Sequence, residues 1–194
     1  EGFAILLSAY AHNTAMQLIT SESNEEGSAF KFLNEVYKAI GGMGLIGGQV
    51  LDLEFRKQNP ILQYADAYRI KRGIKDLLTL CNLFKTAPLF RLSVFAGTVT
   101  TKYSNEVVND LCQCGDIIGM IFQLLDDEED GDIVSQKESY QIQVATTREE
   151  RMEEALFHYQ EIHRILVRNL EDKAENLFSY FSMLVPDLSS GKPS

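Results

Sequence analysis

Apolar residues recur at steps of three and four along almost the whole chain, and this periodicity is the feature that most constrains its fold. Such spacing places one apolar stripe along an α-helix, whereas a half-buried strand alternates apolar and polar residues. No segment shows that alternation convincingly. The sequence therefore predicts an all-α protein. The predicted helices are Gly2–Thr20, Ser28–Ile40, Met43–Gln58, Ile61–Arg72, Ile74–Phe84, Ala87–Thr101, Asn105–Asp130 and Arg148–Leu184.

Residues that favour helix ends mark several of these boundaries. Ser28 and Ser104 are predicted N-caps, because a serine oxygen accepts a hydrogen bond from a free amide of the first turn. Gly41 is a predicted C-cap, Pro60 a helix break and Pro88 a first-turn residue. These signals divide the periodic pattern into separate helices.

Composition places the chain among globular proteins. With 194 residues, 45% of them hydrophobic, it is long enough for one domain, predicted over residues 1–186 and followed by a flexible tail at 187–194. A formal net charge of -10 argues against nucleic-acid binding, which depends on Lys and Arg contacts to phosphates. No apolar run reaches the 18 or so residues of a membrane span. We expect a soluble, cytoplasmic protein that begins within something longer, since its first residue is Glu1.

Three cysteines, Cys81, Cys112 and Cys114, lie in apolar helical patterns without the spacing of a zinc site. An odd number of cysteines in such surroundings favours buried free thiols in a reducing compartment over disulfides or metal ligands.

Carboxylates crowd the end of the predicted helix 105–130, and no Lys or Arg follows until Lys137. Acids at a helix C-terminus face the negative end of the helix dipole, and each costs roughly 0.3–1 kcal/mol unless a positive charge is near. A hard divalent cation, most simply Mg²⁺ carrying a phosphorylated substrate, would supply that charge. A solvated acidic helix end is the alternative. The carboxylates are Asp126, Asp127, Glu128, Glu129, Asp130 and Asp132.

The same helix is predicted to have two different faces. Residues advance about 100° each, so Gln123, Asp126 and Asp130 fall within roughly 40° of Gly119, with Asp127 about 80° away. This face is predicted to meet the cation. The opposite, core-facing side is predicted to carry Val107, Val108, Leu111, Ile118, Ile121, Phe122 and Leu125.

A glycine-rich segment, GGMGLIGGQVLD, covers residues 41–52. Gly44, Gly47 and Gly48 lie inside a helical pattern, where each costs about 1 kcal/mol relative to alanine, so something must approach that backbone closely. A neighbouring helix is one interpretation. The wall of a pocket is the other, because Gln49 and Asp52 lie one turn apart on one face.

Lys85 and Thr86 join two predicted helices, with Pro88 just beyond. Thr86 can cap free amides, Lys85 adds a positive charge, and a helix N-terminus attracts anions. Taken alone this is a weak signal, since Lys-Thr pairs are common at helix starts.

In this order, the motifs GGQVLD (Gly47–Asp52), KT (Lys85 and Thr86) and GMIFQLLDDEED (Gly119–Asp130) resemble those of the trans-isoprenyl diphosphate synthases, the polyprenyl synthetase family. The resemblance implies an isoprenoid-synthase-type helical bundle around a deep apolar cavity, usually as a homodimer. It also implies a prenyltransferase of isoprenoid biosynthesis that uses Mg²⁺ to condense isopentenyl diphosphate with an allylic diphosphate. The metals and basic residues stabilise the departing diphosphate.

The resemblance implies a role for each matching residue. Asp126, Asp127 and Asp130 would hold metal, and Asp52 would support the metal or its water shell. The residues implied to contact or line the substrate site are Gln49, Lys85, Thr86, Gln123 and Lys137, of which Lys85, Thr86 and Gln123 would act in catalysis.

Two departures from the family pattern leave alternatives open. No Asp-Asp-x-x-Asp cluster precedes Asp126, so the first metal motif is missing, and the region after Asp130 is short. Either the sequence is part of a complete enzyme, or the protein is a non-catalytic subunit that pairs with a complete synthase. A class I terpene cyclase is a third hypothesis, against which the glycine helix and the Lys-Thr pair argue. Product chain length cannot be read from these residues.

Overall fold

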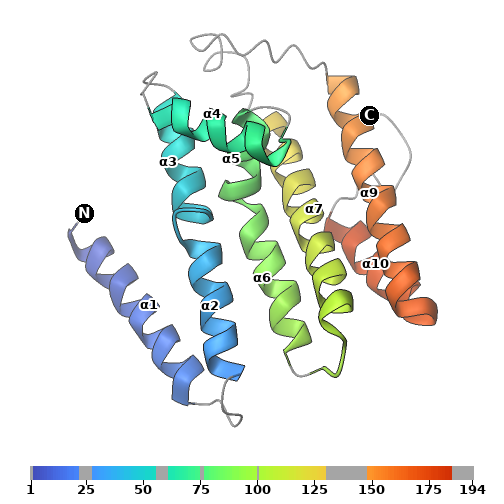
Figure 1. Cartoon of the computed structure of the whole chain (residues 1–194), viewed down its shortest axis with the longest axis horizontal. Coiled ribbons are helices and arrows are strands. Elements are labelled where there is room, and N and C mark those ends of the chain that lie inside the picture. The colour runs from blue at the N-terminus through green and yellow to red at the C-terminus, as the bar shows by residue number, and fades with distance from the viewer. Residues whose placement is uncertain are drawn as a thin grey trace.

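The structure, a computed structural model, describes residues 2–21, 28–55, 61–74, 77–99, 101–129 and 148–184, and throughout this part the regular elements are helices (Figure 1). The all-α prediction is therefore confirmed. The elements are α1 (Gly2–Ser21), α2 (Ser28–Ile40), α3 (Leu45–Phe55), α4 (Ile61–Arg72), α5 (Leu77–Lys85), α6 (Ala87–Thr98), α7 (Asn105–Glu129), α9 (Arg148–Leu170), the 3₁₀ turn η1 (Glu171–Lys173) and α10 (Ala174–Leu184).

Helix α6 lies in the middle of the molecule. It packs most extensively against α7 and also contacts α2, while α5 leads directly into it (Figure 1). Helix α4 crosses near the ends of α3 and α5, α1 lies at one edge beside α2, and α9 with α10 lies at the opposite edge against α7.

Two apolar clusters hold these helices together. One joins α3, α4 and α5, and the other joins α7, α9 and α10, so the α5–α6 junction lies between them. The first contains Leu51, Leu62, Leu77, Leu80 and Cys81. The second contains Leu111, Cys114, Ile117, Ile118, Ile121, Ala155, Tyr159, Ile162, Ile165, Leu166 and Ala174.

The prediction of one long helix over 148–184 is wrong. Glu171 has a positive φ of 47°, and the chain folds back there so that α10 packs on α9. Tyr159 and Ser182, 23 residues apart, share a side-chain hydrogen bond. The reversal lets Phe178 pack against Tyr159, with ring centroids 4.7 Å apart, whereas a continuous helix would hold these two rings apart. Neither Gly nor Pro marks this turn in the sequence.

Three predicted helix-end signals are confirmed. The Val107 amide donates to Ser104 Oγ at 3.3 Å, Gly41 directly follows α2, and Pro88 lies in the first turn of α6. Pro60, the side chain of Ser28 and the predicted tail at 187–194 lie outside the described residues.

We expect Ser104→Ala to lower the free energy of unfolding by about 1 kcal/mol, because the first turn of α7 loses its side-chain acceptor. Urea denaturation followed by circular dichroism measures this change. Ser93→Ala is the matched control, since the exposed Ser93 hydroxyl donates to the Leu89 carbonyl within α6 and caps no helix. Equal effects of the two substitutions would contradict the capping role of Ser104.

All three cysteines are free and buried, as predicted. Burial raises the pKa of the Cys114 thiol to about 12, so it stays protonated and unreactive at neutral pH. Within the described residues, no helix has the length and apolar character needed to cross a bilayer.

Candidate functional site

The junction between α5 and α6 is held between two glycines on neighbouring helices. A Cβ added at Gly48 of α3 would lie 2.3 Å from the Lys85 backbone nitrogen, and one at Gly119 of α7 would lie 2.4 Å from Ala87 Cα. Backbone atoms cannot rotate away as the end of a side chain can, so neither position has room for a methyl group. Gly48 and Gly119 therefore set where Lys85, Thr86 and Ala87 lie between α3 and α7.

This contact decides between the two interpretations of the glycine-rich segment. At Gly48, the close neighbour is the end of another helix, as the packing interpretation expects. That packing also brings Lys85 beside Asp52, but neither Gln49 nor Asp52 lines the pocket between α2, α5, α6 and α7. Gly44 has another cause: a Cβ there would lie 2.1 Å from the Ala39 carbonyl oxygen, so the tight connection between α2 and α3 requires a glycine.

Four of the predicted site residues come together at this junction. The Lys85 ammonium lies 3.3 Å from an Asp52 carboxylate oxygen, and the Thr86 hydroxyl donates to Gln123 Oε1 at 2.5 Å. Asp52 comes from α3 and Gln123 from α7, so residues up to 71 positions apart in the sequence form one polar group. Lys85 and Asp52 are each about one-third exposed, which leaves both charges open to a ligand.

The predicted capping role of Thr86 is wrong. Thr86 is the residue before α6, but its side chain makes no capping hydrogen bond and donates to Gln123 instead. Gln123 is only 3% exposed, and a buried amide oxygen requires a donor. The Thr86 hydroxyl therefore points toward Gln123, because the buried Gln123 oxygen needs a hydrogen-bond donor.

The remaining predicted residues fall in different places. Gln49 lies on α3, where it is exposed, and the described contacts include no hydrogen bond from it to the junction. Helix α7 continues through Asp126 and Asp127 to Glu129, so the helical register of the predicted face is kept beyond Gln123. The side chains of Asp126 and Asp127 lie outside the described part, as do residues Asp130 and Lys137.

The donors predicted for Mg²⁺ suit a hard cation, because they are carboxylate oxygens. Among the side chains that the structure describes, no three His, Cys, Asp or Glu residues form a metal-binding group. The metal site therefore stays a prediction that depends on Asp126, Asp127 and Asp130.

The predicted core-facing side of α7 is confirmed at Leu111, Ile118 and Ile121, which are buried. Phe122 is an exception at 42% exposure, with its ring 5.6 Å from that of Phe90. The side chain of Leu125 lies outside the described part. The side of α7 that carries Gly119 and Gln123 is also buried, because the backbone of α6 packs against Gly115 and Gly119.

An ion pair that the sequence did not predict lies further along the same helices. Arg91 of α6 and Asp116 of α7 are 2.6 Å apart. Burial raises the pKa of the Asp116 carboxyl, while the charge and hydrogen bond of Arg91 act to lower it. Gly115, four residues before Gly119, lies against the Arg91 backbone, so this pair of glycines was a usable sign of close α6–α7 packing.

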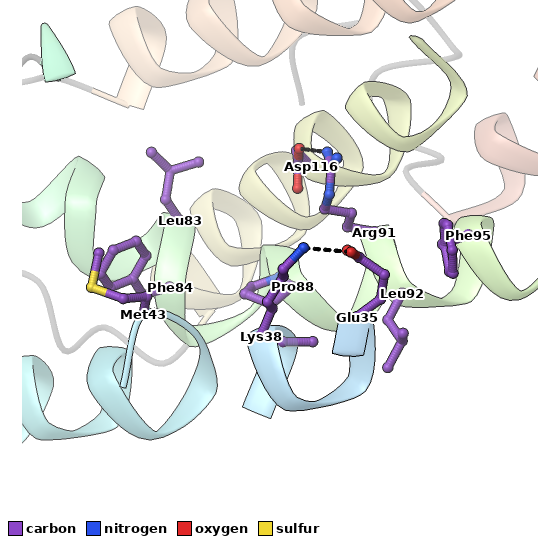
Figure 2. A pocket seen from close by; sticks show the side chains of 11 residues that line it. Glu35, Lys38, Met43, Leu83, Phe84, Pro88, Arg91, Leu92, Phe95 and Asp116 are labelled. Carbon is purple, nitrogen blue, oxygen red and sulfur yellow. Dashed lines mark hydrogen bonds and ion pairs between the residues drawn. The ribbon is translucent and has the colours of Figure 1, made fainter. Parts of the chain in front are cut away.

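A pocket of about 390 Å³ lies between α2, α5, α6 and α7 (Figure 2), and neither Lys85 nor Thr86 is among its lining residues. Phe84 and Pro88, which flank Lys85 and Thr86 in the sequence, both line it. Other apolar lining residues are Ala39, Met43, Leu83, Leu92 and Phe95, and the charged ones are Glu35, Lys38, Arg91 and Asp116.

Comparison with known proteins bears on this arrangement. The family profile described as Polyprenyl synthetase matches residues 1–144. This chain belongs to the polyprenyl synthetase family. The resemblance inferred from the three motifs is thereby confirmed.

Curated relatives of this family member include two kinds of synthase. It is 31% identical over 126 residues to geranylgeranyl pyrophosphate synthase 12, chloroplastic, of Arabidopsis thaliana, an alignment that covers 65% of this chain and 31% of that protein. It is 30% identical over 130 residues to the farnesyl diphosphate synthase of Bacillus subtilis, covering 66% and 40%. The chain thus spans only 31% and 40% of the length of these two relatives.

Proposed function

We propose that the protein is a prenyltransferase that condenses isopentenyl diphosphate with an allylic diphosphate in the presence of Mg²⁺. The observation that carries this proposal is the junction itself, where Lys85 and Thr86 lie between Asp52 and Gln123 near the carboxylate-rich end of α7. Family membership and the names of the relatives support the same reaction class.

The protein's own residues supply binding and orientation of the diphosphate. Lys85 offers a compact positive charge, and the N-terminus of α6 adds the positive end of a helix dipole. Gln123 holds the Thr86 hydroxyl, while Gly48 and Gly119 keep the junction from shifting.

Mg²⁺, when bound by Asp126, Asp127 and Asp130 with support from Asp52, would neutralise the negative charge that grows on the leaving diphosphate. Breaking the allylic carbon–oxygen bond releases diphosphate and leaves a carbocation. The double bond of isopentenyl diphosphate attacks this cation, and loss of one proton gives a product five carbons longer. The apolar residues Phe84 and Pro88 would cover the tail next to the reacting end.

Calorimetric titration with farnesyl diphosphate, with and without Mg²⁺, tests the proposal. We expect binding that requires the metal and that weakens by at least about tenfold in Asp126→Ala, since even supporting residues of metal sites change affinity by 10- to 100-fold. Asp172→Ala in η1 is the control, because Asp172 is an exposed acid of a different element. Unchanged metal-dependent binding in Asp126→Ala would contradict the assigned site.

A further candidate is a non-catalytic subunit that pairs with a complete synthase. Failure of the chain to bind farnesyl diphosphate under either condition would support this candidate. A product assay with farnesyl diphosphate alone tests the terpene cyclase hypothesis, which a hydrocarbon product would support. A homodimeric state and a cytoplasmic location are further parts of the proposal.

A further inference from the structure

Helices α6 and α7 run antiparallel and approach each other closely along one line. Gly119 of α7 lies against Ala87 of α6. One turn earlier on α7, Gly115 lies against Arg91, which is one turn later on α6, and a Cβ added at Gly115 would lie 2.8 Å from Arg91 Cα. These two contacts let the backbones of the helices approach closely.

Polar contacts between the same helices lie at the two ends of this line. At one end the Thr86 hydroxyl donates to Gln123, and at the other the Arg91 guanidinium donates to Asp116 at 2.6 Å (Figure 2). Gln123 and Asp116 are two turns apart on α7, which is about 10 Å along the helix axis. Both contacts therefore depend on the same relative position of α6 and α7.

The glycine contacts set the separation of the two helices, but they do not set how far one helix lies along the other. Van der Waals contact between a glycine and a backbone has no preferred direction, whereas a hydrogen bond weakens steeply as its distance and angle change. The register of α6 on α7 must therefore come from directional contacts, such as the two polar contacts at the ends of the line.

The ion pair is the contact of the two that carries charge in partly buried surroundings. Arg91 and Asp116 are each only about one-third exposed. A shift of α6 that drew Arg91 away would leave the Asp116 carboxylate partly desolvated and without its cationic partner, and such a charge is unfavourable. The pair therefore favours one register over its neighbours.

We propose that Arg91 and Asp116 are positioning residues, whose ion pair fixes the register of α6 on α7 and so brings the Thr86 hydroxyl to Gln123. Neither residue is assigned a contact with diphosphate. The use of Thr86 in diphosphate binding rests on the proposed function, whereas the coupling between the two polar contacts does not.

A comparison of variants by urea denaturation tests this coupling without any ligand. Thr86→Val keeps the shape of the side chain but removes the donor to Gln123. In the unmodified protein we expect it to lower the folding equilibrium constant by about tenfold, because a buried acceptor is left unsatisfied. In Arg91→Met/Asp116→Leu we expect the same substitution to have an effect below about threefold, since residues coupled through a shared helix position are not additive.

Calorimetric titration with inorganic diphosphate and Mg²⁺ tests the consequence for the site. This ligand has no apolar tail, so the new apolar side chains at 91 and 116 offer it no contact. We expect Arg91→Met/Asp116→Leu to bind about tenfold more weakly, as for other residues that support a site. Its stability should be kept, because replacing both partners leaves no buried charge unpaired. A merely structural pair would leave the affinity unchanged.

Exchanging the two charges provides a rescue. Arg91→Asp/Asp116→Arg keeps the attraction between α6 and α7, so its affinity for diphosphate should be within about threefold of that of the unmodified protein. If circular dichroism shows that the apolar variant does not fold, Arg91→Gln/Asp116→Ser takes its place, since it removes both charges with shorter polar side chains.

An ion pair outside this helix pair is the matched control. Glu161→Leu/Arg164→Met removes a pair of 2.8 Å within α9 and should change neither the effect of Thr86→Val nor the affinity for diphosphate. An equal loss of affinity in this control would overturn the inference.

The remaining results separate the inference from the proposed function. Equal effects of Thr86→Val with and without the ion pair would overturn the inference, whether or not diphosphate binds. A smaller effect without the pair, together with no diphosphate binding in any protein, would support the positioning role and contradict the proposed function. Failure of the folded charge-exchanged variant to regain affinity would contradict the ion pair as the cause.

Discussion

Replacing Gly119 with alanine is expected to weaken metal-dependent binding of farnesyl diphosphate by about 10- to 100-fold, the range seen when residues that support a metal site are changed. The new Cβ would lie 2.4 Å from Ala87 Cα, so α6 and α7 must separate. Separation moves Thr86 away from Gln123 and shifts the N-terminus of α6. We also expect a loss of about 1–3 kcal/mol in the free energy of unfolding, as for other overpacked interiors.

Gly97→Ala is the matched control for this prediction. Gly97 lies on the same helix pair, in α6, but a Cβ there meets no atom within 4 Å. We expect unchanged binding and a gain in stability of up to about 1 kcal/mol, since alanine is the better helix former. Calorimetry and urea denaturation measure the two effects. Normal binding by folded Gly119→Ala would show that the close contact does not position the site.

Lys85→Met is expected to weaken diphosphate binding by about 10- to 100-fold, because a hydrogen bond to a charged group contributes about 1.5–3 kcal/mol. Its effect on stability should be below about 1 kcal/mol, since the Lys85–Asp52 pair is partly exposed and water screens it. A large change in affinity with a small change in stability distinguishes a binding role from a structural one.

Lys71→Met on α4 is the control for the change in net charge, because Lys71 is exposed and lies on another element. Titration with inorganic diphosphate as well as farnesyl diphosphate shows whether Lys85 acts on the charged end of the ligand. If Lys85→Met and Lys71→Met bind both ligands equally well, Lys85 has no part in the site.

Local sequence was sufficient for most of the helices and for naming four residues that meet at the α5–α6 junction. Helical periodicity depends on neighbouring residues alone, so the helices α2 and α4 have the predicted limits, and the others up to α7 differ only at their ends. The motifs around Asp52, Lys85 and Gln123 identified residues that do come together. Ser104 likewise accepts a hydrogen bond from the Val107 amide, three residues away. Sequence patterns are informative over such a short distance.

Contacts between distant segments could not be predicted in this way. The sequence indicated that something must approach Gly48, but only the folded chain shows that it is the backbone of Lys85. Thr86 was expected to cap its own helix, yet it donates to Gln123, which lies 37 residues further on. The reversal at Glu171 follows from the packing of α10 on α9 rather than from a Gly or Pro signal.

The sequence by itself determined the all-α class, the family and the residue types available for a diphosphate and a cation, because these follow from spacing along single helices and from ordered motifs. Only the tertiary structure decided which polar groups pair, and that an Arg91–Asp116 pair lies in the pocket beyond the junction. The physical reason is that hydrogen bonds and ion pairs depend on atoms within a few ångströms, and close packing at Gly48, Gly115 and Gly119 sets those distances.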